Sequence, residues 1–209
     1  IKADNRLDAD GTLRGTFTLT AEGQSDSNIR RIFTTGFRSE WKNTMESQLL
    51  AISPKAKLLS VDYGKNPKDY QAAPIKITFR YEIPDYALKG EKEMFFRPLV
   101  MNNLYNQVRS YLRIDTSLEV ASPFPSLSGN YTYHNQLPAG YKLANADKNE
   151  TMQGTGADFE GSLAQQGNKV LLHNKLALKK RVYEAADWDS FRNAVNAHKA
   201  YGEYLVIKK

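Results

Sequence analysis

The sequence predicts an α+β fold, mostly antiparallel β, in which a helix packed on an antiparallel sheet is followed by a β-sandwich-like half with a short C-terminal helix. Two observations lead to this prediction. Residues 75–83 alternate strictly between apolar and polar side chains, which is typical of a strand with one buried and one solvated face. Residues 27–52 carry an apolar side chain about every four positions, which is typical of a helix.

The helix predicted over residues 27–52 should not be straight. Steps of four residues drift by about 40° around a helix axis, so the full series cannot share one face. The later members fit an arc of about 120° and should face the sheet; they are Phe37, Trp41, Met45, Leu49 and Ile52. Two β-branched residues and a glycine at 34–36 predict a bend or a break. Residues 25–27 suit the N-cap, and Pro54 ends the helix.

The remaining elements of the first half are predicted strands. Asp10-Gly11 precedes a period-two pattern at residues 12–21, which is a hairpin signal. A strand at 56–63 should turn Leu59, Val61 and Tyr63 to one side, and a strand at 92–96 can pair with 75–83. With short links between them, these strands suggest a meander that carries the helix on its apolar face.

A change of pattern at residues 98–107 suggests a boundary between residues 1–98 and 99–209. The second half should be strand-rich, with strands at 111–115, 118–121 and 131–134, and a long apolar run at 169–183. Residues 151–167 are polar and contain four glycines, so they are interpreted as loops around one short strand. A short helix at 187–201, with Asp187 as its N-cap, and a final strand at 203–209 close the chain.

Composition excludes several classes of protein. The 209 residues are 41% hydrophobic and 25% charged, which is ordinary for a globular fold. No apolar run approaches the roughly 20 residues of a membrane-spanning helix, so the chain is not expected to span a membrane. It contains no cysteine, which excludes disulfides, thiol nucleophiles and cysteine-ligated metals. It begins at Ile1 without a leader, so we expect a mature product or a piece of a longer protein.

The net charge of +6 does not indicate nucleic-acid binding. Basic residues are scattered, with short clusters only at 30–31, 179–181 and 208–209. A nucleic-acid interface needs them on one stripe with exposed aromatic side chains. A solvated surface is the simpler interpretation, and nucleic acid is not an expected partner.

No catalytic, cofactor-binding or metal-binding constellation emerges from the residues. His134, His173 and His198 are few and far apart, and surface or packing roles are expected for them. Residues 126–129 lack the strand-turn-helix pattern of a serine nucleophile. Gly154 and Gly156 lack the further residues of a phosphate loop. The chain itself is therefore predicted not to be an enzyme and to need no cofactor.

Tyrosine is abundant, with 12 residues. Tyr131, Tyr133 and Tyr141 lie near one another in the sequence and are the candidate binding residues. If exposed, they could form a platform for a glycan or a peptide. Tyrosines in strands are also commonly half-buried sheet residues, so both interpretations stay open.

Several features together resemble a known family. They are the Asp-Gly hairpin, the helix that contains Arg30, Pro84-Asp85-Tyr86-Ala87, then Tyr183, Trp188-Asp189-Ser190-Phe191-Arg192 and the terminal strand at 204–209. Over nearly its full length the chain looks like the β-rich C-terminal region of large exported bacterial proteins. Those proteins have an N-terminal β module and a central transglutaminase-like domain.

The resemblance implies that activity lies in the Cys-His-Asp triad of the central domain. No residue of this chain matches that triad. The resemblance therefore implies a non-catalytic accessory region in the periplasm or at the cell surface, whose partners are neighbouring domains of the same parent chain. The alternative is a stand-alone β module that binds a glycan or a peptide.

Overall fold

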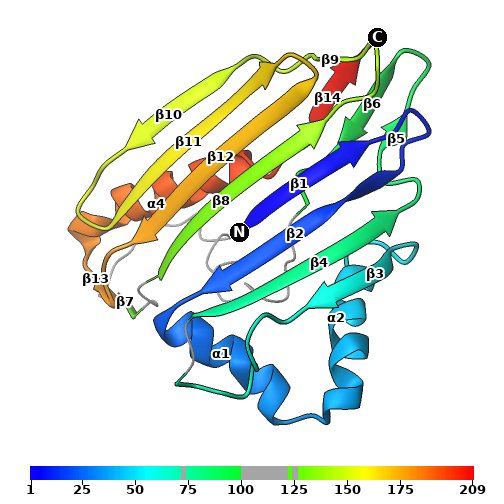
Figure 1. The fold of residues 1–209 in the computed structure, drawn as a ribbon. Helices are drawn as coiled ribbons and strands as arrows, with labels where there is room; N and C mark the ends of the chain where they lie inside the picture. The colour runs from blue at the N-terminus through cyan, green and yellow to red at the C-terminus, as the bar shows by residue number, and fades with distance from the viewer. Residues whose placement is uncertain (72–73, 100–121, 124–126) are drawn as a thin grey trace.

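One large sheet contains strands from both ends of the chain (Figure 1). The computed structural model describes residues 1–71, 74–99, 122–123 and 127–209. The order across the eight-stranded sheet is β10 (Lys148–Met152), β11 (Ala157–Gln166), β12 (Lys169–Leu178), β8 (Leu127–Gln136), β1 (Lys2–Leu7), β2 (Leu13–Ala21), β4 (Ile75–Ile83) and β3 (Lys57–Asp62). β1 pairs with β8 in parallel, and the other pairings in this sheet are antiparallel.

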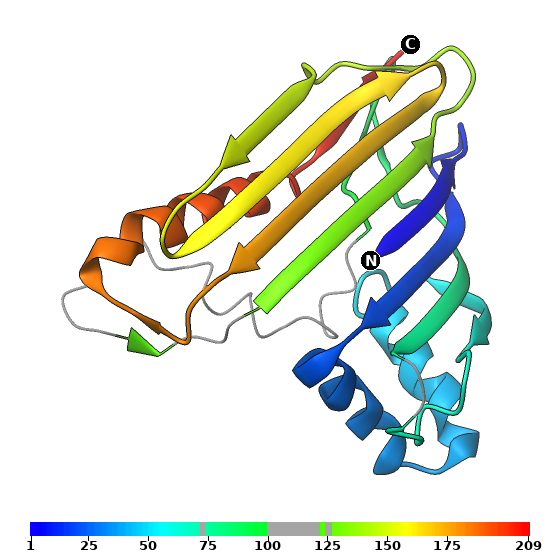
Figure 2. The ribbon, with the colours of Figure 1, turned by 60° about the vertical axis from the view of Figure 1, so that its left-hand side comes forward.

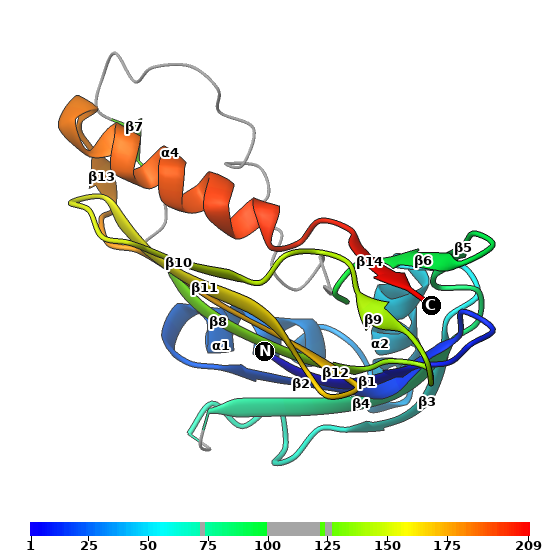
Figure 3. The same ribbon diagram turned by 90° about the horizontal axis from the view of Figure 1, so that it is seen from above.

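Two smaller sheets complete the β structure of the described residues. One has four strands in the order β5 (Leu88–Lys89), β6 (Glu93–Phe96), β14 (Leu205–Lys208) and β9 (Lys142–Leu143). The other pairs β7 (Ser122–Pro123) with β13 (Val182–Tyr183). The four-stranded sheet lies on the same side of the large sheet as the described helices (Figure 3) and forms a second layer of β structure there.

The helices that the structure describes lie on one side of the large sheet (Figure 3). α1 (Gly23–Thr34), the 3-10 turn η1 (Arg38–Glu40) and α2 (Trp41–Leu50) lie at the end formed by β2, β4 and β3. α4 (Ala185–Ala200) packs on β11 and β12 at the other end (Figure 2). The strand residues that face the helices form the core: β4, for example, buries Ile75, Ile77, Phe79, Tyr81 and Ile83. The structure is thus mostly β with helices on one face.

The predicted boundary between residues 98 and 99 does not separate two sheets. β1 and β8, from the two predicted halves, pair directly through residues such as Ala3 and Tyr133. β6 and β14 pair in the four-stranded sheet, and they too come from the two predicted halves. The predicted strands at 111–115 and 118–121 lie outside the described residues.

The break predicted at residues 34–36 is confirmed, because α1 ends at Thr34 and the chain restarts as η1 at Arg38. Trp41, Met45 and Leu49 are buried as expected. Burial of Phe37 was a wrong expectation: its side chain is 77% exposed. Phe37 precedes η1 with an extended backbone, so its side chain does not follow the periodicity of α2.

Both predicted helix caps differ from the structure. α1 begins at Gly23, before the expected cap at residues 25–27, and its N-cap Glu22 makes no side-chain cap bond. The carboxylate of Asp26 instead accepts a hydrogen bond from the Ile75 amide at 2.6 Å, which ties α1 to β4. α4 begins at Ala185 rather than at residue 187. Asp187 lies in its first turn and accepts a hydrogen bond from the Glu184 amide at 3.1 Å.

Residues 151–167 were predicted as loops around one short strand, and this was wrong. They form the end of β10 and the ten-residue strand β11. Only Gly167, with φ +60°, supplies a turn conformation among the four glycines of this stretch. Gly161 lies within β11, where a side chain has no room: a Cβ there would come within 2.6 Å of both the Phe159 ring and the Tyr201 ring. Here glycine marks the close approach of a neighbouring side chain rather than a chain reversal.

Two strand predictions were also wrong in detail. β6 pairs with β5 and β14 instead of with β4. Leu59, predicted to share a side with Val61 and Tyr63, is 54% exposed, whereas Val61 and Tyr63 pack against the core together with buried Leu58. The register between β3 and β4 shifts between Leu58 and Ser60, and such a bulge changes which side chains face the core.

Candidate functional site

The three tyrosines predicted as a binding surface do not share one. Tyr131 and Tyr133 lie on the inner side of β8 and are only 6% and 2% exposed. The Tyr131 ring lies 5.0 Å from the ring of His198 on α4, and burial raises the pKa of Tyr131 to about 12. Tyr141 is partly exposed beside β9, where the Lys209 ammonium lies 5.8 Å from its ring centroid. Two of the three rings are therefore not available as a platform.

The three histidines are also in different places. His134 Nδ1 lies 2.8 Å from Asp4 Oδ1 on the solvated side of the large sheet. His173 Nδ1 lies 3.3 Å from the Thr132 hydroxyl on the same side. His198 is on the inner side, with Nδ1 3.0 Å from Asn174 Oδ1. Within the described ranges, no three His, Cys, Asp or Glu side chains are grouped so that they could hold a metal ion.

His198 should make the protein sensitive to acid. Burial lowers the pKa of His198 from 6.5 to about 4. The unfolded chain then takes up a proton between pH 6.5 and about pH 4 that the folded protein does not. The contribution of neutral His198 to the free energy of unfolding is fully present above pH 6.5 and is lost as the pH falls from 6.5 to about 4. We expect the free energy of unfolding to fall by about 2–3 kcal/mol through this group.

Chemical denaturation at a series of pH values tests this expectation. In His198→Gln the acid-induced loss above pH 4 should shrink, whereas His134→Gln, a variant of an exposed histidine, should retain it. Carboxylates whose pKa is lowered in the folded protein, such as those of Asp26 and Asp187, stabilise it until the pH falls below their ordinary pKa of 3.8. An unchanged acid-induced loss in His198→Gln would show that another group is responsible.

The outer face of the large sheet is the face opposite the described helices (Figure 1), and many of its side chains are exposed or half-buried. Its central rows are mostly polar and include Lys2, Asp4, Arg6, Thr16, Thr18, Thr78, Arg80, Thr132, His134, Ser162 and His173, with Leu171 and Ala164 as apolar members. Some charged side chains of the outer face pair with one another: Arg14 Nε lies 2.9 Å from Glu82 Oε2. No described helix or strand covers this outer face, so it could receive another molecule or domain.

The two edges of the large sheet are less suited to pairing with another strand. β3 carries the bulge near Leu58. β10 points two charged residues to the inner side, since Lys148 lies opposite Leu163 and Glu150 opposite Gly161. Bulges and inward-pointing charges are devices that discourage edge-to-edge pairing. The outer face, rather than an edge, is therefore the candidate contact surface.

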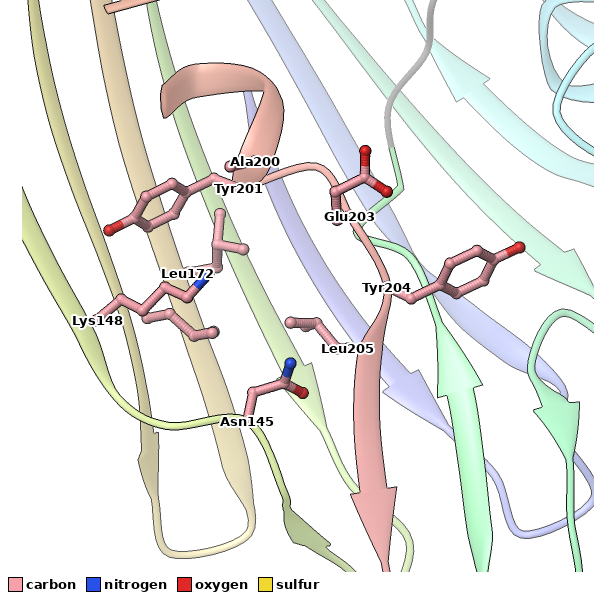
Figure 4. A pocket seen from close by; sticks show the side chains of 9 residues that line it. Asn145, Lys148, Leu172, Ala200, Tyr201, Glu203, Tyr204 and Leu205 are labelled. Carbon is pink, nitrogen blue, oxygen red and sulfur yellow. The ribbon is translucent and has the colours of Figure 1, made fainter. Parts of the chain in front are cut away.

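A pocket of about 190 Å³ lies at the C-terminal end of α4, and we call it the α4 pocket (Figure 4). Its lining residues are Asn145, Lys148, Leu163, Leu172, Ala200, Tyr201, Glu203, Tyr204 and Leu205. They come from β10 and the segment before it, from β11 and β12, and from the end of α4, the start of β14 and the link between these two.

The sequence gives no local signal for the α4 pocket. Its lining residues belong to separate segments, and Lys148 lies just before residues that were interpreted as loops. Only the register of β10 on β11 brings Lys148 beside Tyr201, whose ring centroid is 5.8 Å from the Lys148 ammonium.

Comparison with known proteins places part of this chain in a family. Residues 92–206 match a domain of unknown function with a solved structure, DUF3858. The fold is similar to the crystal structure of a protein described as a "putative protease" from Parabacteroides distasonis, with a TM-score of 0.50 and 11% identity. The similarity covers 57% of this chain and 24% of that chain. No curated protein matches the sequence.

In the part of the chain that the structure describes, no helix has both the length and the apolar character needed to cross a membrane.

Proposed function

The chain belongs to the DUF3858 family, and on that premise we propose that it is a non-catalytic accessory region of a transglutaminase-like exported bacterial protein. In this role it positions the catalytic domain or contacts the substrate of that domain. Its partners are neighbouring domains of the same parent chain, in the periplasm or at the cell surface.

The observation that carries the proposal is the unequal coverage of the structural similarity. More than half of this chain, 57%, corresponds to only 24% of the Parabacteroides distasonis protein. A fold that recurs as a quarter of a longer chain is expected to work together with the rest of such a chain. The protease description of that protein agrees with a hydrolytic or acyl-transfer partner, because transglutaminase-like domains are related to cysteine proteases.

Two features of this chain fit an accessory role. It contains no cysteine, so the nucleophile of a Cys-His-Asp triad would have to come from another domain. Its outer face offers a broad polar surface on which exposed Lys76 and Arg80 form no ion pair with any described residue. Such a surface suits a polar interface between domains of one chain, which is the usual character of such interfaces.

Charge reversal on the outer face tests the proposal in the intact parent protein. The double variant Lys76→Glu, Arg80→Glu should lower kcat/KM by about tenfold, because a mismatched charge at an interface costs on the order of 1 kcal/mol or more. Lys199→Glu, an exposed residue of α4, is the matched control and should change kcat/KM by less than about twofold. If the unmodified protein, the double variant and Lys199→Glu have the same kcat/KM, the outer face is not the contact surface.

A further inference from the structure

We propose that the α4 pocket binds a carboxylate with an apolar body about the size of one amino-acid residue. The carboxylate faces Lys148 and Asn145, and the apolar body lies on the leucines of the floor. This proposal rests on the geometry of the α4 pocket alone and does not depend on the accessory role.

The Lys148 side chain lines the α4 pocket. Lys148 is on the inner side of β10, and Figure 4 shows its ammonium pointing toward Leu172 and the Tyr201 ring, between β10 and the end of α4. Among the described residues it forms no ion pair, although it lies beside the aromatic ring at 5.8 Å. Lys148 is an exposed residue, so an anion that enters the pocket from solvent can reach its ammonium.

The side chain of Asn145 has a fixed orientation at the same pocket. Its side-chain oxygen accepts a hydrogen bond from the Val206 amide at 2.6 Å. This bond fixes the amide group, so that its nitrogen remains as a donor, and Figure 4 shows that nitrogen directed toward Leu205. Two nitrogen donors thus border the same pocket, and they complement a group with acceptor oxygens and a negative charge.

Leucine side chains form much of the remaining lining of the pocket. Leu163, Leu172 and Leu205 are buried and give the pocket an apolar floor. A volume of about 190 Å³ is below the range of about 300–1,000 Å³ that is typical for drug-sized ligands. The pocket therefore suits a single residue-sized group rather than an extended ligand.

The acidic residue of the lining does not oppose a carboxylate. The Glu203 carboxylate lies 3.3 Å from an Arg97 guanidinium nitrogen, and Figure 4 shows it pointing away from Lys148. Tyr204 also points away, and the Arg97 guanidinium lies 4.3 Å from its ring centroid. Arg97 thus holds both side chains at the outer side of the link between α4 and β14.

The shared chemistry could come from a peptide C-terminus or from a free carboxylic acid. Titration of the 209-residue protein, followed by two-dimensional NMR, separates these sources. The probes are N-acetyl-leucine, which resembles a peptide C-terminus, 4-methylpentanoate, which is a free acid, and N-acetyl-leucine amide, which lacks the charge. Both acids should shift the resonances of residues that line the α4 pocket, and the amide should bind at least about tenfold more weakly.

Lys148→Gln should weaken binding of the acids by about tenfold, as expected for loss of one charged hydrogen bond. Lys169→Gln is the control, because Lys169 is exposed on β12 and does not line the pocket. Tighter binding of N-acetyl-leucine would identify a peptide C-terminus, and equal binding of the two acids would identify a free carboxylate. Absence of binding, equal binding of the amide, or equal losses in both lysine variants would overturn the proposal.

Discussion

Replacing Trp41 by alanine should lower the free energy of unfolding by about 3–5 kcal/mol, the range for removing a buried tryptophan. The Trp41 side chain is 5% exposed, and its ring lies 5.2 Å from Phe33 and 5.4 Å from Tyr63. Its indole nitrogen donates a hydrogen bond to the Phe33 carbonyl at 3.3 Å. Trp41 thus joins α1, α2 and the end of β3, and its loss leaves a cavity among all three.

Phe37→Ala is the matched control for Trp41→Ala. Phe37 is also aromatic and is four positions earlier, but it is 77% exposed, so its removal should cost less than about 0.5 kcal/mol. Urea denaturation of the two variants gives the comparison. If Trp41→Ala costs no more than Phe37→Ala, the two-helix segment does not pack as described.

Replacing Arg30 by methionine should also cost about 3–5 kcal/mol, because it breaks a buried ion pair and leaves its partners uncompensated. Arg30 is 1% exposed, and its Nε donates to Asp26 Oδ2 at 2.6 Å. Its Nη1 donates to the carbonyl oxygens of Asn66, Pro67 and Asp69. One guanidinium therefore holds the segment after β3 against α1.

The pKa of Asp26 reflects this arrangement. Burial acts to raise it, but the hydrogen bond from Arg30, that from the Ile75 amide and the charge of Arg30 outweigh burial and hold the pKa below its ordinary value. In Arg30→Met the carboxylate loses its cationic partner, so we expect the pKa of Asp26 to rise.

Arg31→Met separates this effect from the loss of any surface cation. Arg31 is the next residue, is exposed, and donates to the Asn28 side chain at 3.1 Å, so its replacement should cost less than about 1 kcal/mol. Denaturant unfolding measures both variants, and NMR titration of Asp26 measures its pKa. Similar stabilities for the two variants would mean that the Arg30 contacts contribute no more than an exposed pair.

Local pattern was enough to predict several elements of the fold. The alternation at residues 75–83 depends only on which side chains face the core, and β4 occupies this range. The weak helix formers at 34–36 act within one turn, so the break between α1 and η1 could also be read from the sequence. Each of these features depends on neighbouring residues only.

Features that depend on distant residues could not be predicted. The parallel pairing of β1 with β8 joins Asp4 to His134, and no local pattern selects that partner. The glycine at 161 looked like a turn residue because the Tyr201 ring that covers it comes from another element. The same limit applies to the α4 pocket, whose lining is assembled from separate segments, and to Tyr131, which α4 helps to bury.

The coding sequence immediately upstream of Ile1 tests the proposed accessory role most directly. We expect an in-frame domain with a cysteine, a histidine and an aspartate at the positions of a transglutaminase-like triad, preceded by an export signal. An upstream region that encodes only a leader peptide would contradict the accessory role. The chain would then be an exported protein in its own right, and a stand-alone binding module would be the better explanation of its fold.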